Sequence, residues 1–516
     1  MFLAMTSRVE SLSSVRRLAR GSLWNVLGRV FSLVIAFVAT PILLHHLGIE
    51  RWGLFTLSLA VCGTFGILDL GVSAALTRAL AERIGTSQER DAASLVLIAF
   101  IVLSISGFVG AAVAYSLVPL AVDHMLNVPP YLRDETILAF HVLAAAGPLI
   151  VLNAGMWGVL AAYQRFGLAN IVNLPISLLY YIGPMLALAL RADLVSVTIA
   201  LVAVRGAQTL IYLLLLWRAI PDLLCRPRLK FSLLRGLVAI SLWMTISNTL
   251  SSLIMQVDRL IVAGMLTLAA TSYYSAPLDL VLRFIVIPIA ISTAFFPAVA
   301  TSYRTMPARS GALLRIGSLT TILAVWPPCL LVVSFPQELL TLWLGPEVAA
   351  ASHTVLLILG IGTFVACASV LPGTFTDAIG RPDIGAKILL VQAVLFPPII
   401  IVLVRQFGIE GAALAWTARC VISIAVRLWV CIRLCPQLDR VIRPLAWTLA
   451  LGTAALAIYP LISPASLRLT AIILTAPVIL IISVASLMEI PEMLRVYQYT
   501  QGWFGRVAPE QAVDRT

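Results

Sequence analysis

The feature that most constrains this chain is a series of apolar runs, each about 20 residues long, that recurs along its whole length. A helix of about 20 apolar residues is long enough to cross the hydrocarbon core of a bilayer. Of the 516 residues, 61% are hydrophobic and 11% are charged, whereas about 25% of the residues in a soluble domain are charged. We therefore predict an all-α, polytopic membrane protein.

About fourteen runs qualify as candidate spans. The loops between them are short, and the longest predicted outer loop, residues 120–135, is too small to form a separate domain. The predicted spans are residues 22–46, 52–77, 93–119, 136–161, 168–190, 194–217, 236–264, 272–300, 312–334, 351–371, 385–404, 410–432, 444–462 and 466–488.

The distribution of Lys and Arg predicts the orientation, because cytoplasmic loops are enriched in these residues. With the N-terminus inside, the basic N-terminal tail 1–21 and the C-terminal tail 489–516 are both cytoplasmic. The net charge of +12 then reflects topology and contact with anionic lipid rather than nucleic-acid binding. The outer loops carry only Arg51, Arg133, Arg191, Arg405 and Arg468.

The seven cysteines indicate neither a disulfide framework nor a metal site. Their number is odd, most lie in apolar runs, and no CxxC or Cys/His spacing occurs. The sequence therefore predicts no metal and no cofactor.

The chain contains an internal repeat. The stretch WGVLAAYQRFGLANIVNL (157–174) resembles PGTFTDAIGRPDIGAKIL (372–389). Chance similarity between apolar segments is the alternative, and the matched Arg and Pro positions argue against it. At offsets of 214 or 215 the matched residues are Gly158 and Gly373, Pro184 and Pro398, Arg205 and Arg419, and Arg218 and Arg433.

The repeat unit comprises six spans, so both copies enter the membrane from the same side and are parallel repeats. We expect two six-helix lobes around a central cleft suited to alternating access. The predicted parts are an N-lobe at 22–218, a basic cytoplasmic linker at 219–235, a C-lobe at 236–433 and two extra spans within 434–488.

Five stretches, in this order, resemble the polysaccharide-export flippases of the multidrug/oligosaccharidyl-lipid/polysaccharide superfamily. They are ATPILLHHLGIERWGLF (39–55), ILDLGVSAALTR (67–78), MQVDRLIVAGML (255–266), SYYSAPLDL (272–280) and FGIEGAALAWTAR (407–419). The resemblance covers the first twelve spans. Each stretch is short and mostly apolar, so the specificity lies in their order and spacing.

The resemblance implies a flippase, not an enzyme, in the bacterial inner membrane. Such a protein moves undecaprenyl-pyrophosphate-linked oligosaccharide from the cytoplasmic to the periplasmic leaflet for exopolysaccharide or lipopolysaccharide biosynthesis. Some members couple transport to an ion gradient, here H⁺ or Na⁺. The implied partners are the lipid-linked oligosaccharide, a polysaccharide polymerase and export machinery.

Ionisable residues inside the spans are the candidate site residues, because each is costly in hydrocarbon and is expected to face protein or water. They comprise five arginines and three aspartates: Arg29, Arg205, Arg259, Arg283, Arg419, Asp69, Asp258 and Asp279. This cationic excess suits an anionic cargo.

Asp69 has two interpretations. At about 1.5 Å per residue, Arg29 and Asp69 lie at matching depth on adjacent antiparallel spans, which predicts a pair or a shared cleft wall. The alternative is a local cap, in which the Asp69 carboxylate accepts backbone amides at a helix break before Gly71.

The other aspartates have structural alternatives too. Asp279 and Arg283 are spaced i,i+4 and can neutralise each other. Asp258 and Arg259, near the outer end of the seventh span, match the family's "DR" motif, and an interfacial anchor is the alternative reading. These aspartates, like Asp69, are predicted to be coupling or structural charge partners.

Arg205 and Arg419 are the repeat-equivalent cations and lack an acid within a turn of their own helix. Guanidinium groups bind phosphate oxygens bidentately. We therefore predict that Arg205 and Arg419, with Arg29 and Arg283, bind the lipid pyrophosphate or its sugars. The alternative is that they bond helix carbonyls as structural links.

Two other functions are open. One is a related transporter, either a multidrug or ion-coupled exporter or a peptidoglycan-precursor flippase. Multidrug exporters usually favour acidic cleft residues, so the excess of arginine weighs against a multidrug exporter. The other is a membrane polysaccharide polymerase, for which loop 120–135 offers Asp123, Asp134 and Glu135.

Overall fold

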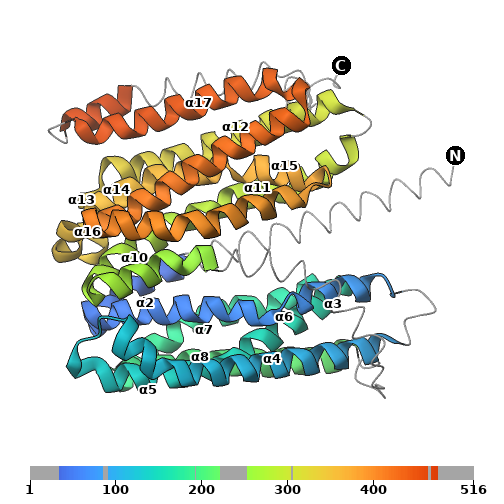
Figure 1. The fold of residues 1–516 in the computed structure, drawn as a ribbon, viewed down its shortest axis with the longest axis vertical. Coiled ribbons are helices and arrows are strands. Elements are labelled where there is room, and N and C mark those ends of the chain that lie inside the picture. Colours follow the sequence, from blue (N-terminus) through green and yellow to red (C-terminus); the bar gives the residue numbers. More distant parts are fainter. Residues whose placement is uncertain are drawn as a thin grey trace, which may run out of the picture. The chain divides into compact units, whose positions relative to one another are not determined.

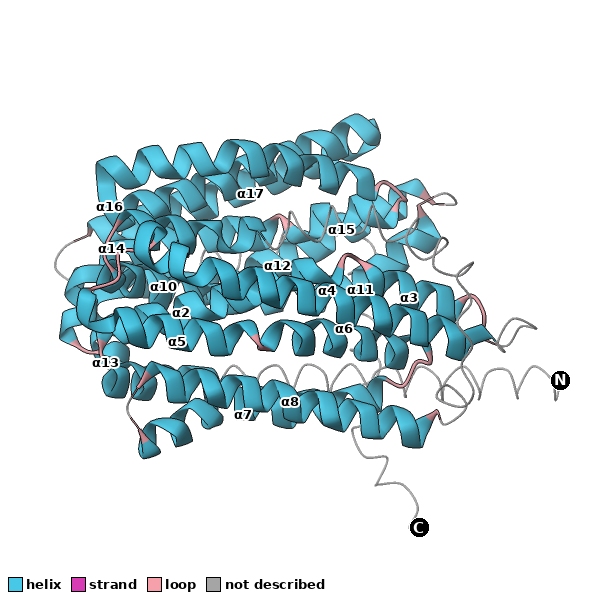
Figure 2. Ribbon diagram, turned by 60° about the horizontal axis from the view of Figure 1, so that its bottom comes forward, coloured by secondary structure: helices cyan, strands magenta, loops and turns pink. Residues whose placement is uncertain are grey.

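The computed structural model describes residues 34–84, 91–191, 193–220, 253–303, 306–462 and 466–474. In these residues all regular structure is helical, as Figure 2 shows. The chain separates into two compact units. Unit 1 contains residues 1–277 and 389–415, and unit 2 contains residues 278–388 and 416–516.

Unit 1 is a bundle of long apolar helices, in which α7 packs along α8, α4 along α6, and α5 along α8 (Figure 1). Its elements are α2 (Ile49–Thr64), the 3-10 turn η1 (Phe65–Asp69), α3 (Val72–Ala81), α4 (Ala92–Leu120), α5 (Arg133–Ala144), α6 (Ala146–Ala162), α7 (Phe166–Leu190), α8 (Leu194–Ala219) and the first part of α10 (Leu268–Leu282).

The core of unit 1 forms where α3, α4 and α6 meet. Its residues recur every three or four positions, which places them on one face of each helix. Large apolar side chains elsewhere on these helices, such as Ile105 and Phe108, remain exposed and suit a lipid environment. The fully buried side chains of the core include Leu76, Leu80, Leu95, Leu103, Val159 and Leu160.

Unit 2 is built around α12, which packs against α11, α14 and α17. The indole of Trp326 on α12 donates to the Gly452 carbonyl of α17 at 3.3 Å and joins the late helix to the unit. The elements are the rest of α10, the 3-10 turn η6 (Arg283–Ile285), α11 (Val286–Ser302), α12 (Pro307–Ser334), α13 (Pro336–Leu344), α14 (Pro346–Ala368), α15 (Val370–Ala378), α16 (Pro382–Leu434) and α17 (Asp439–Ile458). Residues 389–415 of α16 belong to unit 1.

Ten helices among the described residues are long and apolar enough to cross a membrane. One of them, α16, is 53 residues long but breaks at Gly408, whose φ of 60° and ψ of −136° are not helical. It therefore covers two predicted spans, 385–404 and 410–432. The predicted spans 22–46, 236–264 and 466–488 lie partly outside the described residues, so the total of about fourteen remains a prediction.

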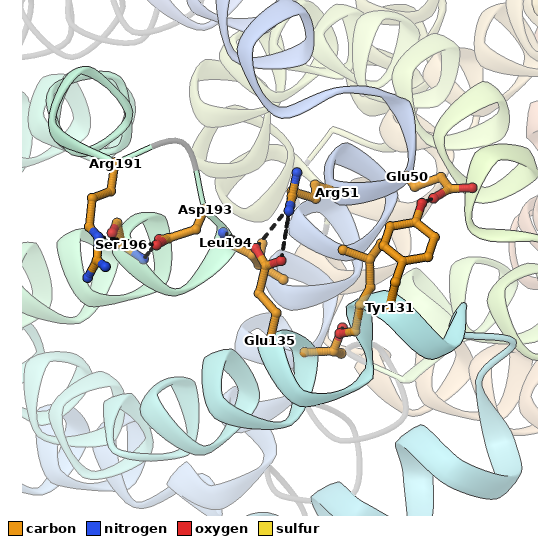
Figure 3. A network of polar contacts seen from close by, with 10 residues as sticks. Glu50, Arg51, Tyr131, Glu135, Arg191, Asp193, Leu194 and Ser196 are labelled. Carbon is orange, nitrogen blue, oxygen red and sulfur yellow. Dashed lines mark hydrogen bonds and ion pairs between the residues drawn. The ribbon is translucent and has the colours of Figure 1, made fainter.

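A polar cluster at one end of unit 1 joins α2, α5 and α8 (Figure 3). The Glu135 carboxylate accepts three bonds of 3.0 to 3.1 Å from Arg51, and a 2.7 Å bond from the backbone N–H of Leu194. Burial alone would raise the pKa of Asp193, but the hydrogen bonds from Ser196, together with the charges of Arg191 and Arg51, lower it. Glu135 and Asp193 thus accept backbone N–H groups in the first turn of α8 and stabilise the start of that helix.

The same end of unit 1 contains a close approach between α2 and α10. A Cβ on Gly53 would overlap the Leu268 carbonyl oxygen, so only glycine fits there. Nearby, the side-chain amide of Asn127 donates to the carbonyls of Gly264 and Leu266 at 3.3 and 2.8 Å. The loop after α4 therefore holds the turn that precedes α10.

Candidate functional site

A polar pocket of about 270 Å³ lies between α7 and α8 in unit 1. Arg205 stands 11 residues after Leu194, which places it about 17 Å along a 26-residue apolar helix, close to its middle. A charged residue at this depth is costly in a membrane, so the pocket is a candidate functional site. Its lining residues are Asn173, Ile176, Ser177, Tyr180, Tyr181, Arg205 and Gln208.

Hydrogen bonds hold the pocket's side chains in place. Arg205 Nη1 donates to Gln208 Oε1 at 3.1 Å, and Gln208 Nε2 donates to Asn173 Oδ1 at 3.5 Å. Behind them, the hydroxyl of the fully buried Tyr212 donates to Asn173 Oδ1 at 2.8 Å, and Asn153 Nδ2 donates to Gln208 Oε1 at 3.3 Å. The side-chain amides of Asn173 and Gln208 are therefore oriented by these hydrogen bonds.

The pocket carries one positive charge. The Arg205 guanidinium lies 5.0 Å from the ring centroid of Tyr180, a cation–π contact. No carboxylate among the described residues forms an ion pair with Arg205. The neutral hydrogen-bond partner leaves its charge uncompensated, so the pocket suits an anionic, oxygen-rich ligand.

Asp69 lies at a break in the second predicted span. Leu70 and Gly71, with φ of 48° and 65°, turn the chain out of the helix, and α3 begins at Val72. One oxygen of the Asp69 carboxylate accepts the backbone N–H of Ser73 at 3.1 Å and also the Ser73 hydroxyl. This is the geometry of a local cap. The predicted partner Arg29 lies outside the described residues, so their pairing remains a prediction.

Asp258 is almost completely buried and accepts the Tyr274 hydroxyl at 2.7 Å. Tyr274 lies on α10 and is itself fully buried. The contact links α10 to the helix that precedes it in the chain. Asp258 thus has a structural contact, and the neighbouring Arg259 is also buried.

Asp279 and Arg283 straddle a change of helix type. Asp279 belongs to α10, and Arg283 begins the 3-10 turn that leads into α11. Pro288 explains the change, because it has no N–H to donate to the carbonyl four residues earlier. A 3-10 stretch inside a long helix often marks a hinge. That Asp279 and Arg283 neutralise each other remains a prediction.

Arg419 lies on the second half of α16 in unit 2. Its guanidinium is 5.9 Å from the ring centroid of Trp416, one turn earlier on the same helix. Thr417, the residue after Trp416, donates to the Ile358 carbonyl of α14 at 3.0 Å. Gly362 of α14 leaves room for the Trp416 ring, because a Cβ there would lie 2.8 Å from it. Arg419 is therefore held where α16 packs on α14.

Arg205 is predicted from the sequence, whereas the residues around it in the pocket are not. Asn173, Ser177 and Tyr180 are spaced i, i+4 and i+7 on α7, so they form a polar stripe on one face of an apolar helix. Arg205, Gln208 and Tyr212 form a similar stripe on α8. A search for polar residues at helical spacing would have found both.

The fold defines a multi-pass membrane protein with a polar pocket at mid-span. The chain resembles an inward-facing multidrug MATE transporter of the MOP superfamily, with a TM-score of 0.68 and 14% identity over 83% of this chain and 96% of that one. It also resembles the lipid II flippase MurJ in an inward closed conformation, with a TM-score of 0.68 and 12% identity over 91% and 99%.

The sequence places the chain more narrowly. Residues 18–302 match the family described as polysaccharide biosynthesis protein, and the chain belongs to this family. Over 416 residues it is 25% identical to a Shigella flexneri protein assigned as an O-antigen transporter, which covers 81% of this chain and 98% of that one. These relatives are transporters and flippases, which agrees with a non-enzymatic role in polysaccharide biosynthesis.

Proposed function

We propose that this protein flips undecaprenyl-pyrophosphate-linked oligosaccharide from the cytoplasmic to the periplasmic leaflet of a bacterial inner membrane by alternating access. Both termini are cytoplasmic in this proposal, and an H⁺ or Na⁺ gradient drives the cycle. Membership of the polysaccharide biosynthesis family and similarity to an O-antigen transporter support it.

The observation that carries the proposal is the uncompensated Arg205 cation in a pocket of amides and tyrosines at mid-span. A pyrophosphate is too costly to move through hydrocarbon without charged or polar partners. An arginine fork that already lies at this depth supplies such a partner. Arg419 supplies a second cation at the repeat-equivalent position, beside Trp416.

The test uses a strain whose own flippase is deleted and that carries this chain together with its glycosyltransferases. Arg205→Ala and Arg419→Ala should each lower surface polymer while membrane abundance stays constant, and lipid-linked repeat units should accumulate on the inner leaflet. The matched control is Arg405→Ala. Arg405 lies on α16, as Arg419 does, but in the outer loop predicted between two spans. Normal polymer output from the Arg205/Arg419 double variant would contradict the proposal.

The polymerase alternative finds little support in the acids of loop 120–135. Asp123 accepts two bonds from Arg133 at 2.7 and 2.9 Å, and Asp134 contacts the same guanidinium at 3.4 Å. Glu135 binds Arg51 and a helix start. These carboxylates neutralise arginines and tie helices together. If substituting them instead caused lipid-linked units to accumulate on the outer leaflet, the polymerase reading would replace the flippase.

A further inference from the structure

The size of the α7–α8 pocket limits what it can hold. Pockets for drug-sized ligands are about 300–1,000 Å³, and this one is about 270 Å³. It therefore has room for one sugar ring with a phosphate, but not for an oligosaccharide repeat unit. Any larger cargo would place only one of its residues here.

The pocket is rich in hydrogen-bond donors. Asn173 Oδ1 already accepts from Tyr212 and Gln208, which fixes the orientation of the amide and leaves Asn173 Nδ2 without a bond to any described residue. Arg205 uses one of its donors on Gln208. The remaining donors suit hydroxyl and phosphate oxygens, which accept hydrogen bonds.

Tyr180 adds an aromatic surface to this polar lining. A sugar ring has an apolar C–H face and a rim of hydroxyl groups, so it is complementary to an aromatic ring bordered by amides. Tyr180 lies beside Arg205, and Ser177 lies one turn earlier on α7. A bare phosphate has no apolar face, so it would use the arginine and leave the tyrosine and amides unused.

The second half of the chain lacks this set of residues. At the offset of 215 that relates the matched turns, Asn173 corresponds to Ile388. At the offset of 214 that relates Arg205 to Arg419, Tyr180 corresponds to Val394 and Gln208 to Ile422. The arginine is thus repeated while its tyrosine and amides are not. Both halves can therefore supply an arginine that binds phosphate, but only the first half has the tyrosine and amides that could select a sugar.

We propose that the pocket between α7 and α8 binds one glycosyl phosphate unit of the cargo headgroup, and that Asn173, Gln208 and Tyr180 select which sugar is accepted while Arg205 binds the phosphate. This inference rests on the proposed flippase function, because it assumes a cargo that contains sugar and phosphate. It assigns specificity to one half of the repeat.

The inference is tested on the purified full-length protein by titration with three probes: glucose 1-phosphate, glucose and inorganic phosphate. A ligand of this size should bind with a dissociation constant of about 1 mM or below. We expect glucose 1-phosphate to bind at least tenfold more tightly than inorganic phosphate, and free glucose to bind more weakly than either. Galactose 1-phosphate and N-acetylglucosamine 1-phosphate then measure the preference between sugars.

The variants separate the two parts of the ligand. Asn173→Leu should reduce the preference between sugar phosphates to less than about twofold and leave inorganic phosphate binding unchanged. Gln208→Leu also removes the acceptor that holds Arg205, so it should weaken the binding of inorganic phosphate as well. Arg205→Gln should abolish phosphate binding. Thr198→Val, which removes another buried hydroxyl from α8 away from the pocket, is the matched control and should bind like the wild type.

Two results would overturn the inference. One is equal binding of inorganic phosphate and all sugar phosphates by the wild type, which would leave only a phosphate site. The other is that no probe binds even at a concentration of about ten times the expected dissociation constant. Polymer export in the flippase-deleted strain is measured separately, so normal export without sugar preference refutes the subsite alone, whereas no export refutes the flippase.

Discussion

Glu135 should make a larger contribution to stability than any other acid in loop 120–135. Its side chain is 17% exposed and its partner Arg51 is 36% exposed. A half-exposed ion pair contributes about 1 kcal/mol. The bond from the Leu194 N–H to a carboxylate contributes about 1.5–3 kcal/mol, because its loss leaves a helix-start donor unpaired. Glu135→Ala should therefore cost about 3 kcal/mol.

The assay is thermal unfolding of the purified protein in detergent, followed by the fluorescence of buried tryptophans. If unit 1 unfolds cooperatively, 3 kcal/mol corresponds to a fall in Tm of about 5 °C. Glu135→Gln retains an acceptor for Leu194 but loses the charge, so its Tm should lie between those of the wild type and Glu135→Ala.

Asp134 provides the matched control, because it is adjacent in sequence and its side chain is 96% exposed. Asp134→Ala should shift Tm by less than about 1 °C, as surface substitutions usually do. If Glu135→Ala and Asp134→Ala have the same Tm, the reasoning is wrong and the contacts of Glu135 in Figure 3 do not stabilise the fold.

Three further predictions concern other contacts. Tyr274→Phe leaves one oxygen of the buried Asp258 without its 2.7 Å donor and should destabilise the protein by about 1–3 kcal/mol, measured as a lower Tm; an unchanged Tm would show that this bond contributes nothing. Gly53→Val should sharply reduce membrane abundance, since its Cβ would overlap the Leu268 carbonyl, and normal abundance would rule out the close approach. Arg468→Ala should increase proteolysis of the C-terminal region relative to Arg468→Lys, because the guanidinium donates to carbonyls at the end of α12 and in the turn that follows α17; equal cleavage of both would count against this role.

The helices could be predicted from sequence because the bilayer imposes a length and a polarity that a one-dimensional pattern records. Even the break of α16 at Gly408 falls between two predicted spans. What the pattern does not record is which polar side chains on different helices meet. Glu135 and Leu194 are 59 residues apart, and nothing in either segment indicates their contact.

The candidate site was predicted only in part for the same reason. A single charged residue such as Arg205 is conspicuous in an apolar run, whereas uncharged amides such as Asn173 and Gln208 stand out less, and their role becomes visible only from the hydrogen bond that joins them. Asp69 was conspicuous as well, and a local cap was one of its two interpretations. The sequence did not choose between them, because the bond to Ser73 depends on the left-handed backbone at Leu70.

The break at Leu70–Gly71 has a consequence for how the nascent chain enters the bilayer. The segment Ile49–Asp69 is less apolar than Ala92–Met125, and the break that follows it exposes backbone polar groups that lipid cannot satisfy. The Leu68 carbonyl at the break accepts the hydroxyl of Ser106 on α4. We therefore expect the translocon to retain this segment until α4 has been synthesised, so that the two helices leave for the lipid together.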